Sequence, residues 1–529
     1  MAFEGSLPIG LPESSTIPDL RDSEPTGTVV WHRNGLRLSD HPAVAAIETD
    51  RLLPLFIFDP AFYGADGLAC DSRIAFLHEC LRDLDGQYRG VGGGGGSGLS
   101  YAHGDPVAIC RRFADRGWRV VAAQQPTGRY GRRRDRAAVH AADVGFVHGD
   151  GLRRTAPTRA GWSDHIEAFL TAEPHDWSPN AVEIESYATG VTISAINETY
   201  DIKPTKQQVP TGGTAAGWKQ LASFVDDIDA YPSSISDPMA ARAGTSGLSP
   251  YLAFGCLSVR QVYQYVIEHA PETRAREMFI SRLFWNRHYT QKLADWHGWL
   301  DTAVNPVLEG FNRERYDPAL VAAWKAGETG FPMVDASMRC LAETGWLNFR
   351  MRAMCASAYF HLLQQPWQIG ADHFYHELID ADAAINYTQW QSQCGLLGVP
   401  GLRLYNPRKQ VRDHEQAAAF IRRWVPELES LPAEQLDQPE STPPHIQEAC
   451  GVEIGENYPY PVVEYESARG EFTQRYSELQ AEAAAALGDP VVAARASLSG
   501  GRERAAAIAD EHGEATTTGS QSSLDQFET

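Results

Sequence analysis

The sequence lacks the cysteine spacing that marks a metal or redox site. Its eight cysteines are scattered along 529 residues without a Cys-x-x-Cys pair, at Cys70, Cys80, Cys110, Cys256, Cys340, Cys355, Cys394 and Cys450. This spacing argues against a disulfide framework and against an iron–sulfur cluster. We therefore expect reduced, mostly buried thiols and no metal site.

A long apolar run and a secretory leader are also missing. No stretch approaches the roughly 18 apolar residues that a membrane-spanning helix needs. Residues 1–27 are rich in Glu, Asp, Pro and Ser, and they have neither the basic nor the apolar region of a signal peptide. The sequence thus predicts a cytoplasmic protein with a disordered N-terminal tail (residues 1–27) and no membrane contact.

Basic residues are scarce beside acidic ones. Lys and Arg total 46 against 68 Asp and Glu, which leaves a net charge of −22. The average field repels nucleic acid, so any contact with DNA requires a local basic patch. An acidic surface with few lysines also suits a salt-rich cytoplasm, where charge repulsion is screened.

What is present is an ordinary globular composition, with 43% hydrophobic and 22% charged residues. A chain of 529 residues is too long for a single core, so we expect two folded domains with tails. Short apolar runs alternate with helix-like segments in the first 150 residues, which predicts a doubly wound parallel α/β domain over residues 28–150. The expected strands are 28–33, 51–59, 99–104 and 118–125, and the expected helices are 40–48, 72–88 and 105–117.

A glycine run at residues 92–96 lies between an expected helix and an expected strand. A phosphate-binding loop lies between a strand and a helix, so we interpret the run as a surface insertion. Residues 151–215 show little periodicity and are interpreted as an interdomain connector.

Helical periodicity dominates residues 216–480, which predicts a second, all-α domain. The longest periodic segments are 217–231, 258–270, 275–296 and 335–365. Residues 481–529 are poor in aromatic residues and rich in Ala, Gly, Ser and Thr, which predicts a mobile tail.

Several long motifs follow one another in the second half. They are AGTSGLSPYLAFGCLSVR (243–260), TGFPMVDASMRCLAETGWLNFRMRAM (329–354), HELIDADAAINYTQWQSQCG (376–395) and LRLYNPRKQVRDHEQAAAFIRRWVPEL (402–428). This order resembles the C-terminal half of the photolyase/cryptochrome family, and VVWHRNGLRLSDHPAVAA (29–46) is similar to the start of its antenna domain. The resemblance covers roughly residues 28 to 430, although Asn34 and Gly35 depart from the usual Arg-Asp-Leu-Arg.

The resemblance implies an FAD-binding helical domain. The residues expected to hold FAD are Tyr231, Thr245, Ser246, Gly247, Leu248, Ser249, Phe279, Arg352, Asp380, Ala381, Asp382 and Asn386. The segment from Thr245 to Ser249 would grip the pyrophosphate. Arg352 and Asp380 would pair beside the flavin ring, Asp382 would accept from the ring edge, and Asn386 would face N5.

Plainer interpretations remain open for some of these residues. Arg352 and Asp380 could form a purely structural buried ion pair. Tyr231 could be an ordinary loop tyrosine, since its spacing to the Thr245 segment is about two residues longer than in the family. The family also carries a folate or deazaflavin antenna pigment in its α/β domain, and the sequence does not say which.

Electron transfer to the flavin is implied for Trp390 and Trp367, which match the proximal and middle tryptophans of the family. Packing in the core is the alternative for either residue. Glu314 stands at the distal position and cannot carry a radical, while Tyr316 lies two residues further on. We expect the usual three-tryptophan chain to be broken or rerouted.

The substrate-facing positions depart from the pattern of repair enzymes. Trp285 matches the pocket tryptophan, but Arg282 replaces a glutamate and Asn286 replaces an arginine. Asn348 and Phe349 stand in place of His-Asn, and Ser392 replaces a second tryptophan. Cations on segments that face DNA in the family are Arg282, Arg287, His288, Arg350, Arg403, Arg408, Lys409 and Arg412, and a solvated, acid-paired helix face is the alternative.

The last residues carry a short motif, with Gln521, Leu524 and Phe527 spaced as in a sliding-clamp (PCNA) interaction peptide. Glu528 replaces the second aromatic residue of that motif.

The resemblance implies a blue-light-dependent lyase that repairs pyrimidine photoproducts in damaged DNA. A cryptochrome-like light sensor without repair activity is the alternative, and a non-photochemical FAD protein is a third. We expect a monomer.

Overall fold

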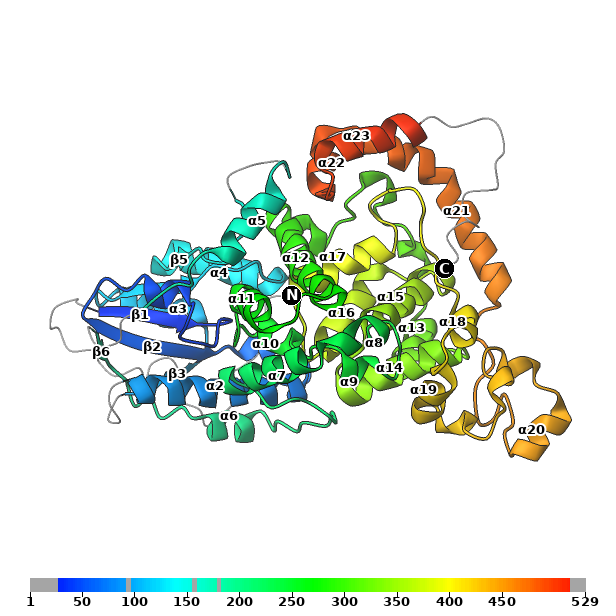
Figure 1. The fold of residues 1–529 in the computed structure, drawn as a ribbon, viewed down its shortest axis with the longest axis horizontal. Coiled ribbons are helices and arrows are strands. Elements are labelled where there is room, and N and C mark those ends of the chain that lie inside the picture. Colours follow the sequence, from blue (N-terminus) through cyan, green and yellow to red (C-terminus); the bar gives the residue numbers. More distant parts are fainter. Residues whose placement is uncertain (1–26, 92–96, 155–158, 178–181, 514–529) are drawn as a thin grey trace.

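The computed structural model describes residues 27–91, 97–154, 159–177 and 182–513. Within these ranges the chain forms an α/β part followed by a helical part, which lie side by side (Figure 1). The predicted fold class, a parallel α/β domain before an all-α region, is therefore confirmed. The clamp-like residues Gln521, Leu524 and Phe527 and the tail 1–26 lie outside the described residues.

The sheet forms where β-branched and aromatic residues concentrate. Its strands are β1 (Gly27–His32), β2 (Arg51–Phe58), β3 (Ser100–His103), β4 (Arg119–Ala123), β5 (Gly145–Val147) and β6 (Glu183–Ile184). The order is β3-β2-β1-β4-β5, with all pairs parallel, and the short β6 pairs with the start of β2. Thr28 lies opposite Leu52 in β2 and opposite Arg119 in β4.

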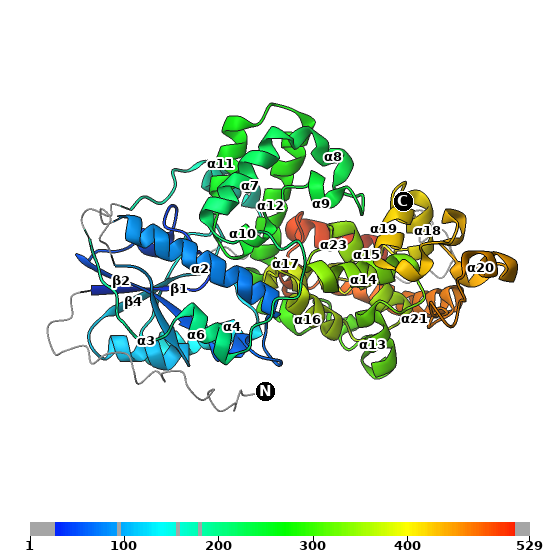
Figure 2. The same ribbon diagram turned by 90° about the horizontal axis from the view of Figure 1, so that it is seen from below.

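Helices cover both faces of this sheet, as Figure 2 shows for α2 on one side and α3 and α4 on the other. They are α1 (Pro42–Ala45), α2 (Asp71–Val91), α3 (Pro106–Ala114) and α4 (Arg129–Ala142). Because successive side chains of a strand point to opposite faces, Val30 joins the core beneath α2, whereas Val29 and Trp31 join the core beneath α3. Both faces of the sheet are therefore buried.

The region from 151 to 215, predicted as an irregular connector, contains more structure than expected. It includes α5 (Trp162–Thr171), β6 and α6 (Ile193–Thr199). β6 extends the edge of β2 beside β3, so this segment belongs partly to the sheet. Its path brings Thr205 and Lys206 against α2, where their amide N–H groups donate to Ser72 Oγ.

The helical part contains the long segments that periodicity predicted. Its helices are α7 (Thr214–Asp226), α8 (Tyr231–Ser234), α9 (Ala241–Gly244), α10 (Ser249–Ala253), α11 (Val259–His269), α12 (Arg274–Asp295), α13 (Pro318–Ala326), α14 (Pro332–Thr344), α15 (Phe349–Ser357), α16 (Trp367–Glu377), α17 (Ala383–Gln393), α18 (Pro407–Asp413), α19 (Ala417–Trp424), α20 (Pro444–Cys450) and α21 (Tyr465–Ala486). The expected helix 335–365 is split, because Gly345 adopts a left-handed φ of 64° and ends α14.

The C-terminal prediction was partly wrong. Residues 481–512 are not a tail: α21 continues to Ala486, and α22 (Pro490–Ala496) and α23 (Gly501–His512) follow it. Ala496, Ala505 and Ile508 are buried in the main helical core. Small residues can pack helices closely without aromatic side chains, which explains why composition suggested a tail.

All eight cysteines are free thiols in the structure, and six of them are buried. The expectation of reduced, mostly buried cysteines is confirmed. Among the described residues, no helix has both the length and the apolar character needed to cross a membrane.

Candidate functional site

A crevice of about 510 Å³ opens between the sheet and the helical part. Residues after β1 and β4 form one wall, and the start of α17 forms the other. The strand order reverses between β1 and β4, so this crevice lies at the carboxyl edge where ligands of open α/β sheets bind. We call it the interdomain crevice.

Ala381, Asp382 and Ala383 lie on the helical wall of the crevice. Asp382 is the N-cap of α17 and accepts a hydrogen bond from the Ile385 N–H at 2.9 Å. Burial raises the pKa of Asp382, while that N–H and the nearby Arg287 guanidinium act in the opposite direction. An enclosed carboxylate at a cavity wall can accept from a polar ligand edge.

Two residues before Asp382, the Asp380 carboxylate is buried against Arg352 from α15. Arg352 Nη2 donates to both carboxylate oxygens, at 2.8 and 3.1 Å. Arg352 Nε also donates to the Leu347 carbonyl at 2.8 Å, so the guanidinium has a fixed orientation. The structure thus brings together the two residues that the resemblance paired, although 28 positions separate them.

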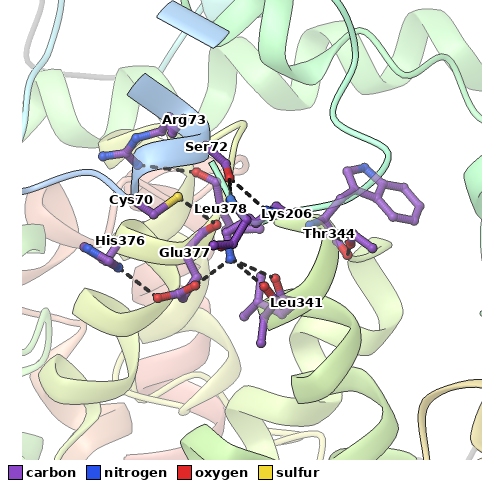
Figure 3. Close-up of polar contacts among 12 residues, drawn as sticks. Cys70, Ser72, Arg73, Lys206, Leu341, Thr344, His376, Glu377 and Leu378 are labelled. Atoms are coloured by element: carbon purple, nitrogen blue, oxygen red, sulfur yellow. Dashed lines mark hydrogen bonds and ion pairs between the residues drawn. The ribbon is translucent and has the colours of Figure 1, made fainter. Parts of the chain in front are cut away.

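We call residues 377–382 the flavin-side loop. Figure 3 shows the polar contacts that hold its first residues, Glu377 and Leu378. Lys206 Nζ donates to Glu377 Oε2 at 2.6 Å and to the Ala342 carbonyl at 2.9 Å. Arg73 of α2 donates to the carbonyls of Tyr375 and Leu378. The connector and the α/β part therefore hold the loop directly.

Neighbouring charges in this cluster determine the pKa of Glu377. Burial raises the pKa of Glu377, but the His376 hydrogen bond and the Lys206 ammonium outweigh burial and lower that pKa to about 2. The Lys206 side chain is only 3% exposed. Sequence reasoning missed Lys206 because nothing local links it to Glu377, 171 positions away.

Asn386 is buried on α17, one turn after the flavin-side loop. Its Nδ2 donates to the Ala371 carbonyl at 2.9 Å, which fixes which end of the amide faces α16. The carbonyl end of the amide is an acceptor for a ligand N–H group.

The predicted phosphate segment has the conformation of a tight turn before α10. Gly247 has a φ of +61°, and a Cβ there would also meet Gln220 Nε2 at 3.1 Å. Gln220 donates to the Ser246 carbonyl, and Thr245 Oγ1 donates to the Ala241 carbonyl at 2.6 Å. Leu248 is buried, and Ser249 is the first residue of α10. The Thr245 hydroxyl hydrogen is therefore used within the protein, and Ser246 Oγ accepts from the Leu248 N–H at 3.4 Å.

Tyr231 begins α8 and packs edge-on against Phe224 and Phe279, at ring-centroid distances of 5.6 and 5.7 Å. Burial raises the pKa of its hydroxyl to about 12, and the neighbouring Arg282 guanidinium opposes this rise. Tyr231 is thus a core residue beside Arg282, and Arg282 projects from the same face of α12 as Phe279.

Two large aromatic side chains lie open near this cluster. Trp285 is 41% exposed and stacks on Tyr289 at 5.7 Å, and Phe349 is 52% exposed. Their helices, α12 and α15, both contact residues 231–237: Arg282 lies beside Tyr231, and Asn348 Nδ2 is 3.4 Å from the Ile235 carbonyl. We call Arg282, Trp285 and Phe349 the substrate-side face.

Other predicted substrate residues have local partners. Asn286 Oδ1 accepts from Arg287, and Ser392 Oγ donates to the Thr388 carbonyl at 2.7 Å. Arg350 Nη2 reaches Ser236 Oγ at 3.5 Å, while its buried Nε has no partner in the described structure. Arg403 is exposed.

Two of the cations in the predicted basic set are neutralised. Arg408 pairs with Glu440 at 2.6 Å and Arg412 pairs with Asp437 at 3.0 Å. The alternative of an acid-paired helix face therefore describes these two residues.

The predicted electron carriers occupy different surroundings. Trp390 is buried in a ring cluster with Phe374, Tyr359 and Trp324, at centroid distances of 5.2, 5.8 and 6.0 Å. Trp367, also buried, begins α16 and contacts Tyr387 at 6.5 Å. At the surface, Glu314 is exposed and Tyr316 is 53% exposed.

Within the described ranges, no group of three His, Cys, Asp or Glu side chains could hold a metal ion. The predicted flavin set supplies an acceptor at Asp382 and an Arg352 guanidinium that is oriented by Asp380 and the Leu347 carbonyl. Groups of this kind can bind the polar edge of an organic cofactor.

Comparison with known proteins gives the same result. Residues 28–151 match the family model described as DNA photolyase, and residues 279–478 match the FAD binding domain of DNA photolyase. A deoxyribodipyrimidine photo-lyase from Streptomyces griseus is 31% identical over 462 residues, covering 84% of this chain and 98% of the relative. A cryptochrome DASH from Natronomonas pharaonis is 30% identical over 479 residues, covering 83% and 98%.

Solved structures share the fold. A cryptochrome from Synechocystis has a TM-score of 0.74 at 22% identity, covering 85% of this chain and 99% of that one. A class III photolyase from Agrobacterium tumefaciens has a TM-score of 0.69 at 24% identity, covering 91% and 100%. The two family models and the relative that is 31% identical over 84% of this chain all point to one family. The chain therefore belongs to the photolyase/cryptochrome family and contains its FAD-binding domain.

Proposed function

We propose that this protein repairs pyrimidine photoproducts in damaged DNA, driven by blue light. The observation that carries the proposal is the open substrate-side face, where Trp285 and Phe349 are 41% and 52% exposed. Trp285 also stacks on Tyr289, and an open aromatic pair of this kind offers a flat apolar surface to a planar partner. Exposed aromatic rings on the helices α12 and α15 suit stacking on the bases of a nucleotide flipped out of a duplex.

FAD would be held by residues from three segments of the helical part. The Thr245–Ser249 turn would bind the pyrophosphate, Asp382 and the Arg352–Asp380 pair would bind the polar edge of the ring, and the Asn386 carbonyl oxygen would accept from the ring N–H. When bound and reduced, FAD supplies the light-excited electron for the repair. The buried Lys206–Glu377 cluster keeps the loop rigid while the charge changes.

Arg282 has a role that differs from the glutamate it replaces. Its guanidinium is a fixed cation near the Tyr231 and Tyr289 hydroxyls. A pyrimidine that accepts an electron develops negative charge on its carbonyl oxygens, and a nearby guanidinium stabilises that charge. Trp285 would stack on the damaged bases and exclude water.

The test uses the purified protein with its flavin reduced under anaerobic conditions. It is mixed with irradiated oligonucleotides that carry either a cyclobutane dimer or a (6-4) photoproduct, and product is measured with and without blue light. We expect light-dependent loss of one lesion class, and Trp285→Ala should slow this loss about tenfold at DNA concentrations below saturation, because stacking on the damaged bases is lost. Absence of repair for both lesions by a fully reduced protein contradicts the proposal.

A light sensor is the second candidate, and the C-terminal helices favour it. Lys292 Nζ at the end of α12 donates to the Ala496 carbonyl of α22 at 2.8 Å, so the helix that carries Arg282 and Trp285 also anchors α22. A change at the flavin could loosen these helices. Limited proteolysis after Ala486 in light and in darkness tests this: a light-dependent cleavage without repair supports a sensor, and equal cleavage excludes it.

The remaining partners are proposals of the same kind. The interdomain crevice has the position and the volume for a folate or deazaflavin antenna. Sliding-clamp binding through Gln521, Leu524 and Phe527, a monomeric state and a cytoplasmic location rest on the sequence alone.

A further inference from the structure

A second cavity, of about 630 Å³, lies between α4, the C-terminal end of α12 and the helices α22 and α23. We propose that it binds a phosphorylated small molecule of nucleotide size. The cavity is separate from the flavin-side loop and from the substrate-side face, so the proposal does not depend on the repair or the sensor function. Figure 1 shows α22 and α23 above the end of α12.

The position of the cavity follows from the sheet. Gln124, Gln125 and Thr127 come directly after β4, and Phe146 lies in β5, so the cavity is at the carboxyl edge of the sheet. α4 lies between it and the interdomain crevice: Arg132 and Arg136 line this cavity, whereas Arg133 and Arg134 line the crevice. Residues 125–127 line both and form a common wall. Its other wall comes from α22 and α23, which follow the matched family model ending at residue 478.

The lining is strongly basic in a chain with a net charge of −22. Six arginines line the cavity, and they are Arg132, Arg136, Arg153, Arg154, Arg159 and Arg502. The two acidic residues of the lining are already bound. Asp135 pairs with Arg33 at 2.5 Å, and Asp295 accepts from Ser497 Oγ at 2.7 Å and from Gln291 Nε2 at 2.6 Å.

Two buried guanidinium nitrogens have no hydrogen-bond partner in the described structure. They are Nη1 of Arg159 and Nε of Arg132. The Arg159 side chain is 6% exposed, and it uses Nε for Ser497 and Asp295. A buried charged donor without an acceptor is costly, and such groups are rare unless a ligand supplies the acceptor.

At the rim, Arg136 and Arg502 are exposed and have no ion pair or side-chain hydrogen bond within the described residues. The pKa of His297, another residue of the lining, is lowered to about 4, chiefly by burial and also by the charges of Arg132 and Arg136. The cavity therefore combines buried unsatisfied donors with free cations at its entrance.

A phosphate group is the anion that matches this arrangement best. Guanidinium groups bind phosphate oxygens through two parallel hydrogen bonds, and several arginines can share one phosphate. Val139, which is 44% exposed, and Leu498 add apolar surface for the organic part of the ligand. The volume lies within the range of small-molecule sites.

The experiment is calorimetric titration of the full-length, flavin-containing protein with AMP, ADP and inorganic phosphate at low ionic strength. The test variant removes both rim cations, Arg136→Gln with Arg502→Gln. The matched control, Arg82→Gln with Arg274→Gln, removes two exposed arginines outside the cavity. We expect nucleotide binding to weaken at least about tenfold in the test variant and to remain unchanged in the control.

A second measurement follows the His297 ring by NMR as pH is varied. A bound phosphate stabilises the imidazolium, so saturation with AMP should raise the pKa of His297 above about 4. The proposal is overturned if no probe binds below about 1 mM, if both double variants bind equally, or if the pKa of His297 does not change on binding. It is also overturned if a short DNA duplex, and no mononucleotide, binds through Arg136 and Arg502.

Discussion

The flavin-side loop and the substrate-side face belong to the same helical region but are held in opposite ways. Between residues 377 and 382 each charged group has a fixed partner: Glu377 pairs with Lys206 of the connector, and Asp380 pairs with Arg352 of α15. Asp382 accepts from the Ile385 N–H. On the substrate-side face, Trp285 and Phe349 are open to solvent. The loop matches the family pattern and the face departs from it, which suggests that cofactor binding is fixed by the architecture whereas the choice of substrate is not.

The largest expected effect is on the loop. Asp380→Ala leaves the Arg352 guanidinium, which is 24% exposed, without its anion. Breaking an enclosed pair in this way should lower the free energy of unfolding by about 3 kcal/mol and abolish flavin retention. Flavin absorbance after purification and urea denaturation measure both. The control Arg412→Gln removes an exposed ion pair and should lower the free energy of unfolding by no more than about 1 kcal/mol. Full flavin content in Asp380→Ala would contradict the view that the flavin-side loop fixes cofactor binding.

Lys206→Met should have the next largest effect. The variant keeps the apolar stem but removes the ammonium that donates to Glu377 and to the carbonyls of Leu341 and Ala342. We expect a loss of about 2 kcal/mol in unfolding free energy and weaker flavin binding. Lys203→Met removes an exposed partner of Asp201 and should change neither.

The same pair predicts a pH dependence. The pKa of Glu377 is lowered from 4.5 to about 2, so its carboxylate contributes stability that is fully present above pH 4.5. This contribution is lost as pH falls from 4.5 toward about 2. Lys206→Met should flatten the fall in unfolding free energy over this range, as measured by urea titration at several pH values, and an unchanged slope would show that another group sets it.

Trp390→Phe tests a buried residue of the helical core that belongs to neither the flavin-side loop nor the substrate-side face. The smaller ring should cost about 1–2 kcal/mol through incomplete packing. It should also slow photoreduction of the flavin, because Trp390 is the indole predicted to donate first. Trp324 lies 6.0 Å from Trp390, whereas Trp367 contacts Tyr387. Flash spectroscopy of Trp324→Phe and Trp367→Phe then shows which of the two donates the next electron, to the oxidised Trp390.

The smallest effect on stability is expected for Trp285→Ala. A side chain that is 41% exposed should change the unfolding free energy by no more than about 0.5 kcal/mol. Binding of lesion-containing DNA should weaken by about tenfold, since base stacking on an aromatic ring is lost. Tyr460→Ala, which removes another exposed aromatic side chain, is the control. Equal DNA affinity in the unsubstituted protein and in both variants would show that the substrate-side face does not bind DNA.

Sequence patterns predicted the parts of the molecule that rely on local order. Strands β1, β2 and β4 stand out as short apolar runs, and α11 and α12 as periodic helices. The Arg352–Asp380 pair came from the resemblance, because nothing in local spacing joins the two residues. Helix α4 was missed because its buried positions are Gly131, Asp135, Ala138 and Ala142, which give no apolar stripe.

Contacts between residues far apart in the chain could not be predicted from the sequence, for a related reason. The Lys206–Glu377 pair and the arginine cavity bring together residues from distant segments, and each residue is an ordinary surface type by itself. The C-terminal helices were hidden by alanine, a residue that serves equally well in a tail and in a close helix contact.

The docking of α22 and α23 has a practical consequence for expression. A protein cut at residue 478, where the matched family model ends, would expose the alanine-lined surface beneath these helices and strip Lys292 of its Ala496 acceptor. Such a fragment is expected to aggregate. Affinity tags and fluorescent fusions should therefore be placed beyond residue 513, and crystallisation screens should retain all of α23.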